Sequence, residues 1–146
     1  MKHLRIRGAD LWLMTCVRNE DDLFDAFNSG PDAVISPFHF SDSDKALAEI
    51  LELSDSFIPA VYVIKGAGVA RRRKQDVHEI LNKLYDLGFY RMCVLDTDMS
   101  LDAGSWERIA DRFPSCIPFP GCPGGDIDGY GFESRVVPVR FRTSRR

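Results

Sequence analysis

Hydrophobic and polar positions alternate in blocks between residues 11 and 113, and the blocks have two kinds of spacing. Four short runs, at residues 11–17, 33–35, 58–64 and 91–95, are apolar at nearly every position. After each run, apolar residues recur at every third or fourth position, which is typical of a helix with one buried face. The pattern therefore predicts the element order βαβαβαβα.

The boundaries of these helices carry their own local signals. Asn19, followed by acidic residues, predicts an N-cap and a first helical turn, and residues 41–44 predict a second cap. Gly30-Pro31 predicts the end of the first helix, because proline cannot continue it. Gly88 predicts the C-cap of the third helix.

The element order predicts the fold class. Short strands that are apolar throughout and separated by amphipathic helices are typical of parallel sheets joined by right-handed crossovers. We therefore predict an α/β protein of Rossmann-like type, with a mostly parallel sheet and helices on both faces. We expect a single domain over residues 1–146. Its βα core should span residues 10–113, and residues 114–146 should form a Pro/Gly-rich loop, an edge strand near 136–141 and a basic tail.

Composition places the chain among ordinary globular domains. It has 146 residues, of which 45% are hydrophobic, and a formal net charge of -3. No apolar run reaches the roughly 18 to 20 residues of a membrane span, and no signal-peptide core follows the N-terminus, so we expect a cytoplasmic protein without a membrane span. The four cysteines form no CxxC pair and are predicted to be core or incidental thiols.

Two basic islands stand in an otherwise acidic chain. The first is Arg71-Arg72-Arg73-Lys74, and the second is the C-terminal tail. If the first island opens a helix, its charges oppose the helix dipole, and a bound phosphate would relieve them. Alternatively, these side chains point into water, or the helix begins several residues later. The tail leaves an anionic acceptor, nucleic acid included, conceivable.

The residues that follow the predicted strands are the candidates for a site, since ligands of open parallel sheets bind beyond the carboxyl ends of the strands. Asp96-Thr97-Asp98 follows the fourth strand. Two carboxylates one residue apart can hold a divalent cation whose shell is completed by phosphate oxygens. The alternative is a pair of loop acids, one of which caps the next helix.

Taken in order, residues 11–113 resemble the nucleotide-sugar-binding half of inverting family 2 glycosyltransferases, which have the glycosyltransferase-A fold. The segment Val17-Arg18-Asn19-Glu20 resembles the end of that family's first strand. Residues 61–64 with the glycine turn and the arginines resemble its third strand and phosphate-side loop. The segment Leu95-Asp96-Thr97-Asp98 resembles the strand that carries its DxD motif.

The resemblance implies a donor site for a nucleotide-diphosphate sugar with Mn²⁺ or Mg²⁺. Asp98, with Asp96, would hold the metal, and Asp96 would also approach the ribose. The family's strand order would place the fourth strand beside the first and bring Glu20 and Asp98 into one crevice. The residues implied for nucleotide binding are Arg18, Asn19, Glu20, His39, Lys65, Arg71 and Asp96.

This chain also departs from the family. Phe38-His39-Phe40 stands where the family has its first acidic pair, so the family's base-reading carboxylate is absent unless Asp42 or Asp44 replaces it. His39 either contacts the base instead or is a structural side chain. Little chain follows Asp98 to supply an acceptor site, and Asp126 and Asp128 are the candidates for a catalytic base.

Three functional hypotheses follow. The first is a small metal-dependent glycosyltransferase with an unknown acceptor. The second is a catalytically degenerate domain of the same fold that binds a nucleotide or a protein partner. The third is another Mg²⁺-dependent phosphotransfer enzyme, because residues 96–101 also resemble the nucleophile motif of haloacid-dehalogenase-type phosphatases. The predicted edge strand near 136–141 could pair with a second copy of the chain.

Overall fold

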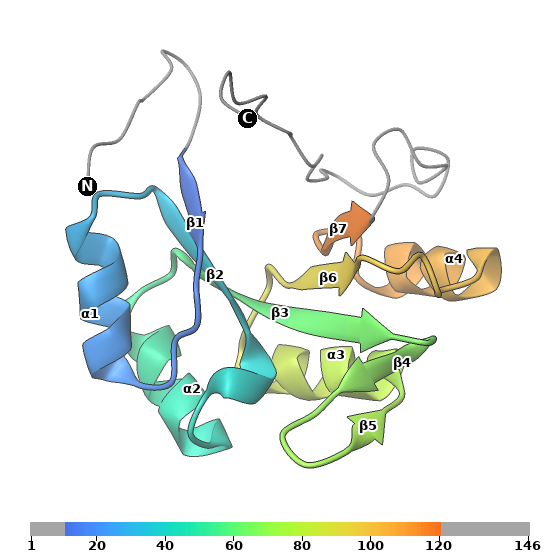
Figure 1. The fold of residues 1–146 in the computed structure, drawn as a ribbon, viewed down its shortest axis with the longest axis horizontal. Helices are drawn as coiled ribbons and strands as arrows, with labels where there is room; N and C mark the ends of the chain where they lie inside the picture. The colour runs from blue at the N-terminus through green and yellow to red at the C-terminus, as the bar shows by residue number, and fades with distance from the viewer. Residues whose placement is uncertain (1–10, 121–146) are drawn as a thin grey trace, which may run out of the picture.

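A parallel sheet of five strands forms the centre of the protein in a computed structural model, which describes residues 11–120 (Figure 1). The strands lie side by side in chain order, and each pairs in parallel with its neighbour. The curled, helix-flanked sheet confirms the predicted α/β class and is consistent with a Rossmann-like fold. The five strands are β1 (Trp12–Met14), β2 (Ala33–Pro37), β3 (Phe57–Ile64), β6 (Cys93–Asp96) and β7 (Ile117–Pro120).

Four α-helices and one 3₁₀ turn connect the strands, and local capping chemistry sets most of their ends. Asn19 accepts the Asp22 N–H at the start of α1, as predicted, and Ser43 accepts the Ala46 N–H at the start of α2. Gly88, at φ 118°, ends α3 in the left-handed region, also as predicted. The elements are α1 (Glu20–Asn28), η1 (Phe38–Phe40), α2 (Asp44–Leu53), α3 (Val77–Leu87) and α4 (Ala103–Arg112).

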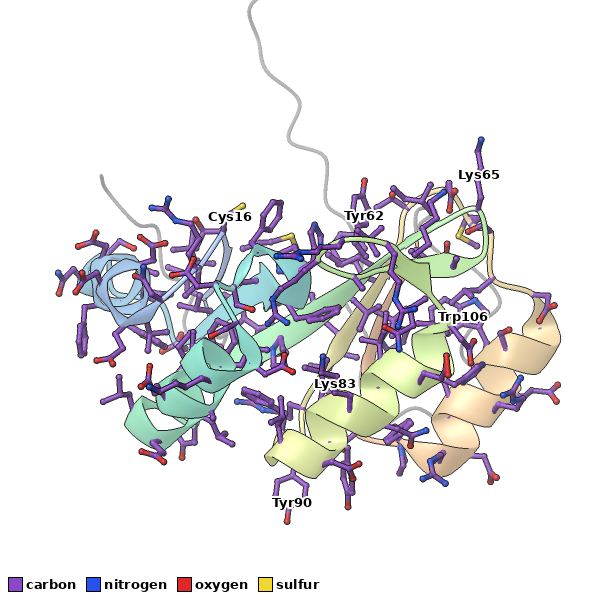
Figure 2. All side chains as sticks on the ribbon, turned by 90° about the horizontal axis from the view of Figure 1, so that it is seen from below. Cys16, Tyr62, Lys65, Lys83, Tyr90 and Trp106 are labelled. Atoms are coloured by element: carbon purple, nitrogen blue, oxygen red, sulfur yellow. The ribbon has the colours of Figure 1, made fainter. Side chains whose placement is uncertain are left out.

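All four α-helices pack against the same face of the sheet (Figures 1 and 2). The larger core cluster contains residues of every helix, whereas the cluster on the opposite face contains strand residues alone, with the side chain of Tyr62 packed against it. Helices were expected on both faces, and within residues 11–120 this detail is wrong. The reason is topological: each right-handed crossover adds the next strand at the same edge, so every helix falls on the same side. The wall of a (β/α) barrel has this arrangement.

A small antiparallel hairpin extends from β3 and was not predicted. It consists of β4 (Ala67–Val69) and β5 (Lys74–Gln75). The β3–β4 connection is a two-residue turn in which Lys65 and Gly66 both have positive φ, 52° and 79°, as a type I′ turn requires. Helix α3 begins only at Val77, so the basic run 71–74 forms the β4–β5 turn and the start of β5, not a helix N-terminus. The alternative that the helix begins later is therefore confirmed.

The sheet continues beyond the predicted limit of the core at residue 113. Residues 117–120, expected to belong to the Pro/Gly-rich loop, form β7 beside β6. Pro118 and Pro120 fit there because, among the described strands, β7 pairs only with β6 and lies at an edge. The predicted strand near 136–141, the basic tail and both candidate bases, Asp126 and Asp128, lie outside the described residues. Within residues 11–120, no helix combines the length and the apolar character needed to cross a bilayer.

The hairpin packs closely on α3 at Gly68, which leads to a stability prediction. A Cβ at Gly68 would lie 2.5 Å from Ile80 Cδ1 and 3.2 Å from the Gln75 carbonyl oxygen. We expect Gly68→Ala to lower the free energy of unfolding by about 1–2 kcal/mol through overpacking. Gly104→Ala is the control, because its nearest contact is an ordinary 3.5 Å in a helix that favours alanine. Urea unfolding of both variants measures the difference, and equal midpoints would contradict the close packing.

Candidate functional site

The candidate site residues follow the carboxyl ends of the strands and form three groups, of which the first two are in contact. Arg18, Asn19 and Glu20 follow β1. His39 lies in η1 after β2 and is close to Arg71 of the hairpin. The third group follows β3 and β6 and comprises Lys65, Asp96 and Asp98. The order of the strands determines which groups can act together.

The first and third groups do not share a crevice. β6 pairs with β3 and β7, and β1 pairs with β2 among the described strands. Three strand spacings therefore separate β1 from β6, a distance of about 14 Å. The expectation that the fourth strand lies beside the first, bringing Glu20 to Asp98, is wrong. Since every strand is added at the same edge, strand order never reverses within the parallel sheet.

Asp96 ends β6 with its carboxylate inside the protein and fully engaged. Its side chain is 0% exposed. Oδ1 accepts the Ser100 N–H (2.9 Å) and the Ser100 hydroxyl (3.2 Å), and Oδ2 accepts the Leu101 N–H (3.0 Å). Burial raises the pKa of Asp96, while the bonds from Leu101 and Ser100 oppose that rise. The carboxylate therefore shapes the β6–α4 loop.

Asp98 joins that loop to the β3–β4 turn. Its Oδ2 accepts the Lys65 N–H (2.9 Å), and the Gly66 N–H donates to Ser100 Oγ (2.8 Å). The Lys65 N–H, followed by the Ser100 hydroxyl, lowers the pKa of Asp98 to about 2. The Lys65 side chain projects from the turn into solvent (Figure 2). Helix α4 is capped by Asp102, which accepts the Ser105 N–H (2.8 Å). Asp96 and Asp98 do not cap this helix.

Arg71 fixes the basic hairpin to the segment after β2. Its Nε donates to the Ser41 carbonyl oxygen (3.0 Å), and its Nη2 donates to Ser41 Oγ (2.7 Å). Its Nη1 donates to Asp44 Oδ1 (2.7 Å), and the guanidinium lies 5.8 Å from the centre of the Phe38 ring. Lys83 of α3 also reaches Asp44 (3.0 Å). Burial raises the pKa of Asp44, but the bonds from Arg71 and Lys83 outweigh it and leave the pKa lowered.

The loop after β1 continues this group. The Asp42 N–H donates to the Arg18 carbonyl oxygen (2.9 Å), and Asn19 Nδ2 donates to Asp42 Oδ2 (3.2 Å). The Arg18 side chain pairs with Asp22 at 2.8 Å. Glu20 is exposed and lines a shallow hollow together with Asn19 and two further acids. The structure therefore brings Arg18, Asn19, His39 and Arg71 onto one edge, with Glu20 beside an acidic surface.

Three cations of the hairpin have no acidic partner among residues 11–120. The side chains of Arg72, Arg73 and Lys74 are exposed. Within residues 11–120, none of them has an ion pair or a side-chain hydrogen bond. Arg71 anchors the turn that displays them. The hairpin thus places a fixed patch of positive charge, Arg72, Arg73 and Lys74, beside η1, and we call these three residues the basic turn.

His39 and Phe40 form an aromatic pair next to Ser41. Their ring centres lie 4.3 Å apart with a tilt of 34°. His39 is half-buried, and its buried Nδ1 has no hydrogen-bond partner within the described part of the chain. Burial, followed by the charge of Arg71, lowers the pKa of His39. The imidazole is therefore neutral at pH 7, and the Phe40 ring, 42% exposed, covers part of it.

No three-ligand metal cluster accompanies these groups. Among residues 11–120, no set of three or more His, Cys, Asp or Glu side chains is close enough to hold an ion. A metal at the DxD motif would have Asp98 and the buried Asp96 as its protein ligands. The sequence matches no protein-family model and no curated protein.

The sequence-based prediction gave several residues of the site no role or a different one. Ser41 and Asp44 were interpreted as helix-cap residues, whereas both also bind Arg71. Ser100 had no predicted role, although it touches both Asp96 and Gly66. A local signal for this loop was the strand-end aspartate itself, because aspartate side chains commonly bond to backbone N–H groups that follow them in the chain. The partners of Arg71 lie about 30 residues away, where no local pattern shows them.

Proposed function

We propose that this protein is a binding domain for a phosphate-bearing ligand, with the basic turn as the phosphate site. The observation that supports this is the exposed charge of Arg72, Arg73 and Lys74, which has no acidic partner in the described part of the chain and sits on a turn anchored by Arg71. Adjacent like charges repel one another, and a multivalent anion relieves that repulsion. The proposal corresponds to the non-catalytic hypothesis, in which the domain binds a nucleotide or a related anion.

The engagement of the DxD motif favours binding over catalysis. Both oxygens of Asp96 already accept hydrogen bonds, and its side chain is closed to solvent. A catalytic carboxylate must contact its metal or substrate, which would require these bonds to be exchanged. The surface beside the basic turn needs no such rearrangement to meet an anion.

Titration of the full chain with inorganic tripolyphosphate tests the proposal. We expect binding at low ionic strength that weakens steeply with added salt, because the contacts are exposed charges. The double variant Arg72→Gln/Arg73→Gln should lose at least about tenfold in affinity, from roughly 1 kcal/mol per exposed charge contact. Lys45→Gln/Arg108→Gln removes the same net charge elsewhere on the surface and should keep the affinity. Equal losses in both double variants, or no binding at low salt, would overturn the proposal.

Transfer of a sugar from a nucleotide-diphosphate donor is the second candidate. What supports it is Asp98, which is exposed and ionised at neutral pH, with the carboxyl of Asp96 next to it. Mn²⁺ or Mg²⁺ there would neutralise charge on a departing diphosphate. Another Mg²⁺-dependent phosphotransfer reaction would use the same two carboxylates, Asp96 and Asp98. Metal-dependent hydrolysis of a sugar donor that is lost in Asp98→Asn would favour this candidate, and unchanged hydrolysis in that variant would exclude it.

A further inference from the structure

We infer that the ligand of the basic turn is a nucleotide whose base stacks on the exposed ring of Phe40. The inference rests on the proposed phosphate site and names the class of molecule bound there. It draws on the position of Phe40 relative to Arg71, on the rigidity of η1 and on the uncharged character of the His39–Phe40 pair.

A short chain of contacts links the aromatic pair to the basic turn. Phe40 is followed by Ser41, whose hydroxyl accepts a 2.7 Å hydrogen bond from Arg71, and Arg71 is followed by Arg72. Phe40 and the exposed Arg72 are therefore the sequence neighbours of two residues that are joined by a hydrogen bond. Figure 1 shows the β4–β5 turn beside the segment that follows β2. A ligand with a flat apolar end and an anionic end fits this spacing.

The turn that carries Phe40 is held in place, and the Phe40 ring packs against His39. Phe38 of the same turn is 2% exposed in the core, and the Ser41 hydroxyl also donates to the Phe38 carbonyl oxygen. Arg71 then binds Ser41 twice. A fixed aromatic face loses little conformational freedom when a base stacks on it. Single-stranded nucleic-acid sites also combine aromatic platforms with nearby cations.

The chemistry of the neighbouring groups selects a base over an anion at Phe40. His39, whose ring centre lies 4.3 Å from that of Phe40, has a lowered pKa and is neutral at pH 7. Asp42, two residues beyond Phe40, is an exposed acidic residue. Phosphate groups should therefore lie at Arg72 and Arg73, away from Asp42, while the uncharged base covers the ring.

The test compares ATP with inorganic tripolyphosphate on the full chain by calorimetric titration. We expect ATP to bind about 5- to 100-fold more tightly, which is the usual gain from stacking one base. Phe40→Leu should remove most of that preference and leave the affinity for tripolyphosphate unchanged. Phe40→Trp should keep or increase it. Phe24→Leu, which alters a phenylalanine of α1 that is 52% exposed, is the matched control and should change neither affinity.

The outcomes separate this inference from the proposed function. If neither tripolyphosphate nor ATP binds, the proposed phosphate site itself is contradicted. Binding of tripolyphosphate with no preference for ATP would overturn the base platform alone, as would a preference that survives Phe40→Leu. Circular dichroism of Phe40→Leu at the titration temperature should match the wild type, because the ring is exposed. UTP should also exceed tripolyphosphate, since every base offers a π-face.

Discussion

Replacing Asp96 with alanine should lower the free energy of unfolding by about 3–5 kcal/mol, with no ligand or metal present. The substitution leaves three donors without their acceptor, namely the buried Leu101 N–H and the part-buried N–H and hydroxyl of Ser100. Each unsatisfied buried group costs about 1–3 kcal/mol, and part of that cost is recovered when the loop opens to water. Denaturant unfolding followed by the fluorescence of buried Trp106 would measure the loss.

Asp98→Ala is the matched control for Asp96→Ala. Asp98 is exposed, so water can replace it as the acceptor for the Lys65 N–H, and the variant should unfold close to the wild type. Ser100→Ala removes the hydroxyl that bonds to Asp96 and should fall between the two variants. Residues kept for catalysis often reduce stability, and their removal then stabilises the fold. An Asp96→Ala protein as stable as the wild type, or more stable, would therefore favour a metal or substrate role for this carboxylate.

The elements that the sequence predicted correctly are those specified within a few residues. The caps at Asn19 and Gly88 depend on their own backbone and its nearest turn, so composition and spacing are sufficient to find them. Strand order depends instead on which edges come together. An apolar run such as residues 91–95 fits beside either edge of a growing sheet, so its place next to β3 carried no local signal.

The candidate site follows the same division between local and distant contacts. The loop after Asp96 is local, because its three donors come from residues 100 and 101. The hairpin was missed because Gly66 and Gly68 indicate a loop when the antiparallel partner is unknown. The interpretation of Arg71 as a phosphate ligand rested on the charge of residues 71–74 and on the family resemblance. Its acceptors at Ser41 and Asp44 become neighbours only after β2 and β3 have paired.

Replacing Arg71 with methionine should lower the free energy of unfolding by about 2–3 kcal/mol while preserving the contact with the Phe38 ring. The loss comes from three hydrogen bonds to Ser41 and Asp44, at least one of them charge-assisted on both sides. Arg71→Lys should recover less than half of it, since an ammonium group cannot reproduce the planar fork that reaches two residues. Arg72→Met, at the neighbouring exposed position, should stay within about 0.5 kcal/mol of the wild type.

Hydrogen exchange distinguishes an anchoring role for Arg71 from a ligand-binding one. The Ala70 N–H donates to the Arg73 carbonyl oxygen (2.8 Å) across the basic turn, so its protection reports whether the turn stays closed. If Arg71 is the anchor, Arg71→Met should lose that protection before any ligand is added, and tripolyphosphate should bind more weakly because its cations are no longer fixed. If Arg71 instead contacts phosphate directly, the variant should keep both its stability and the Ala70 protection while losing affinity. That combination would restore Arg71 to the nucleotide-binding role that its charge first suggested.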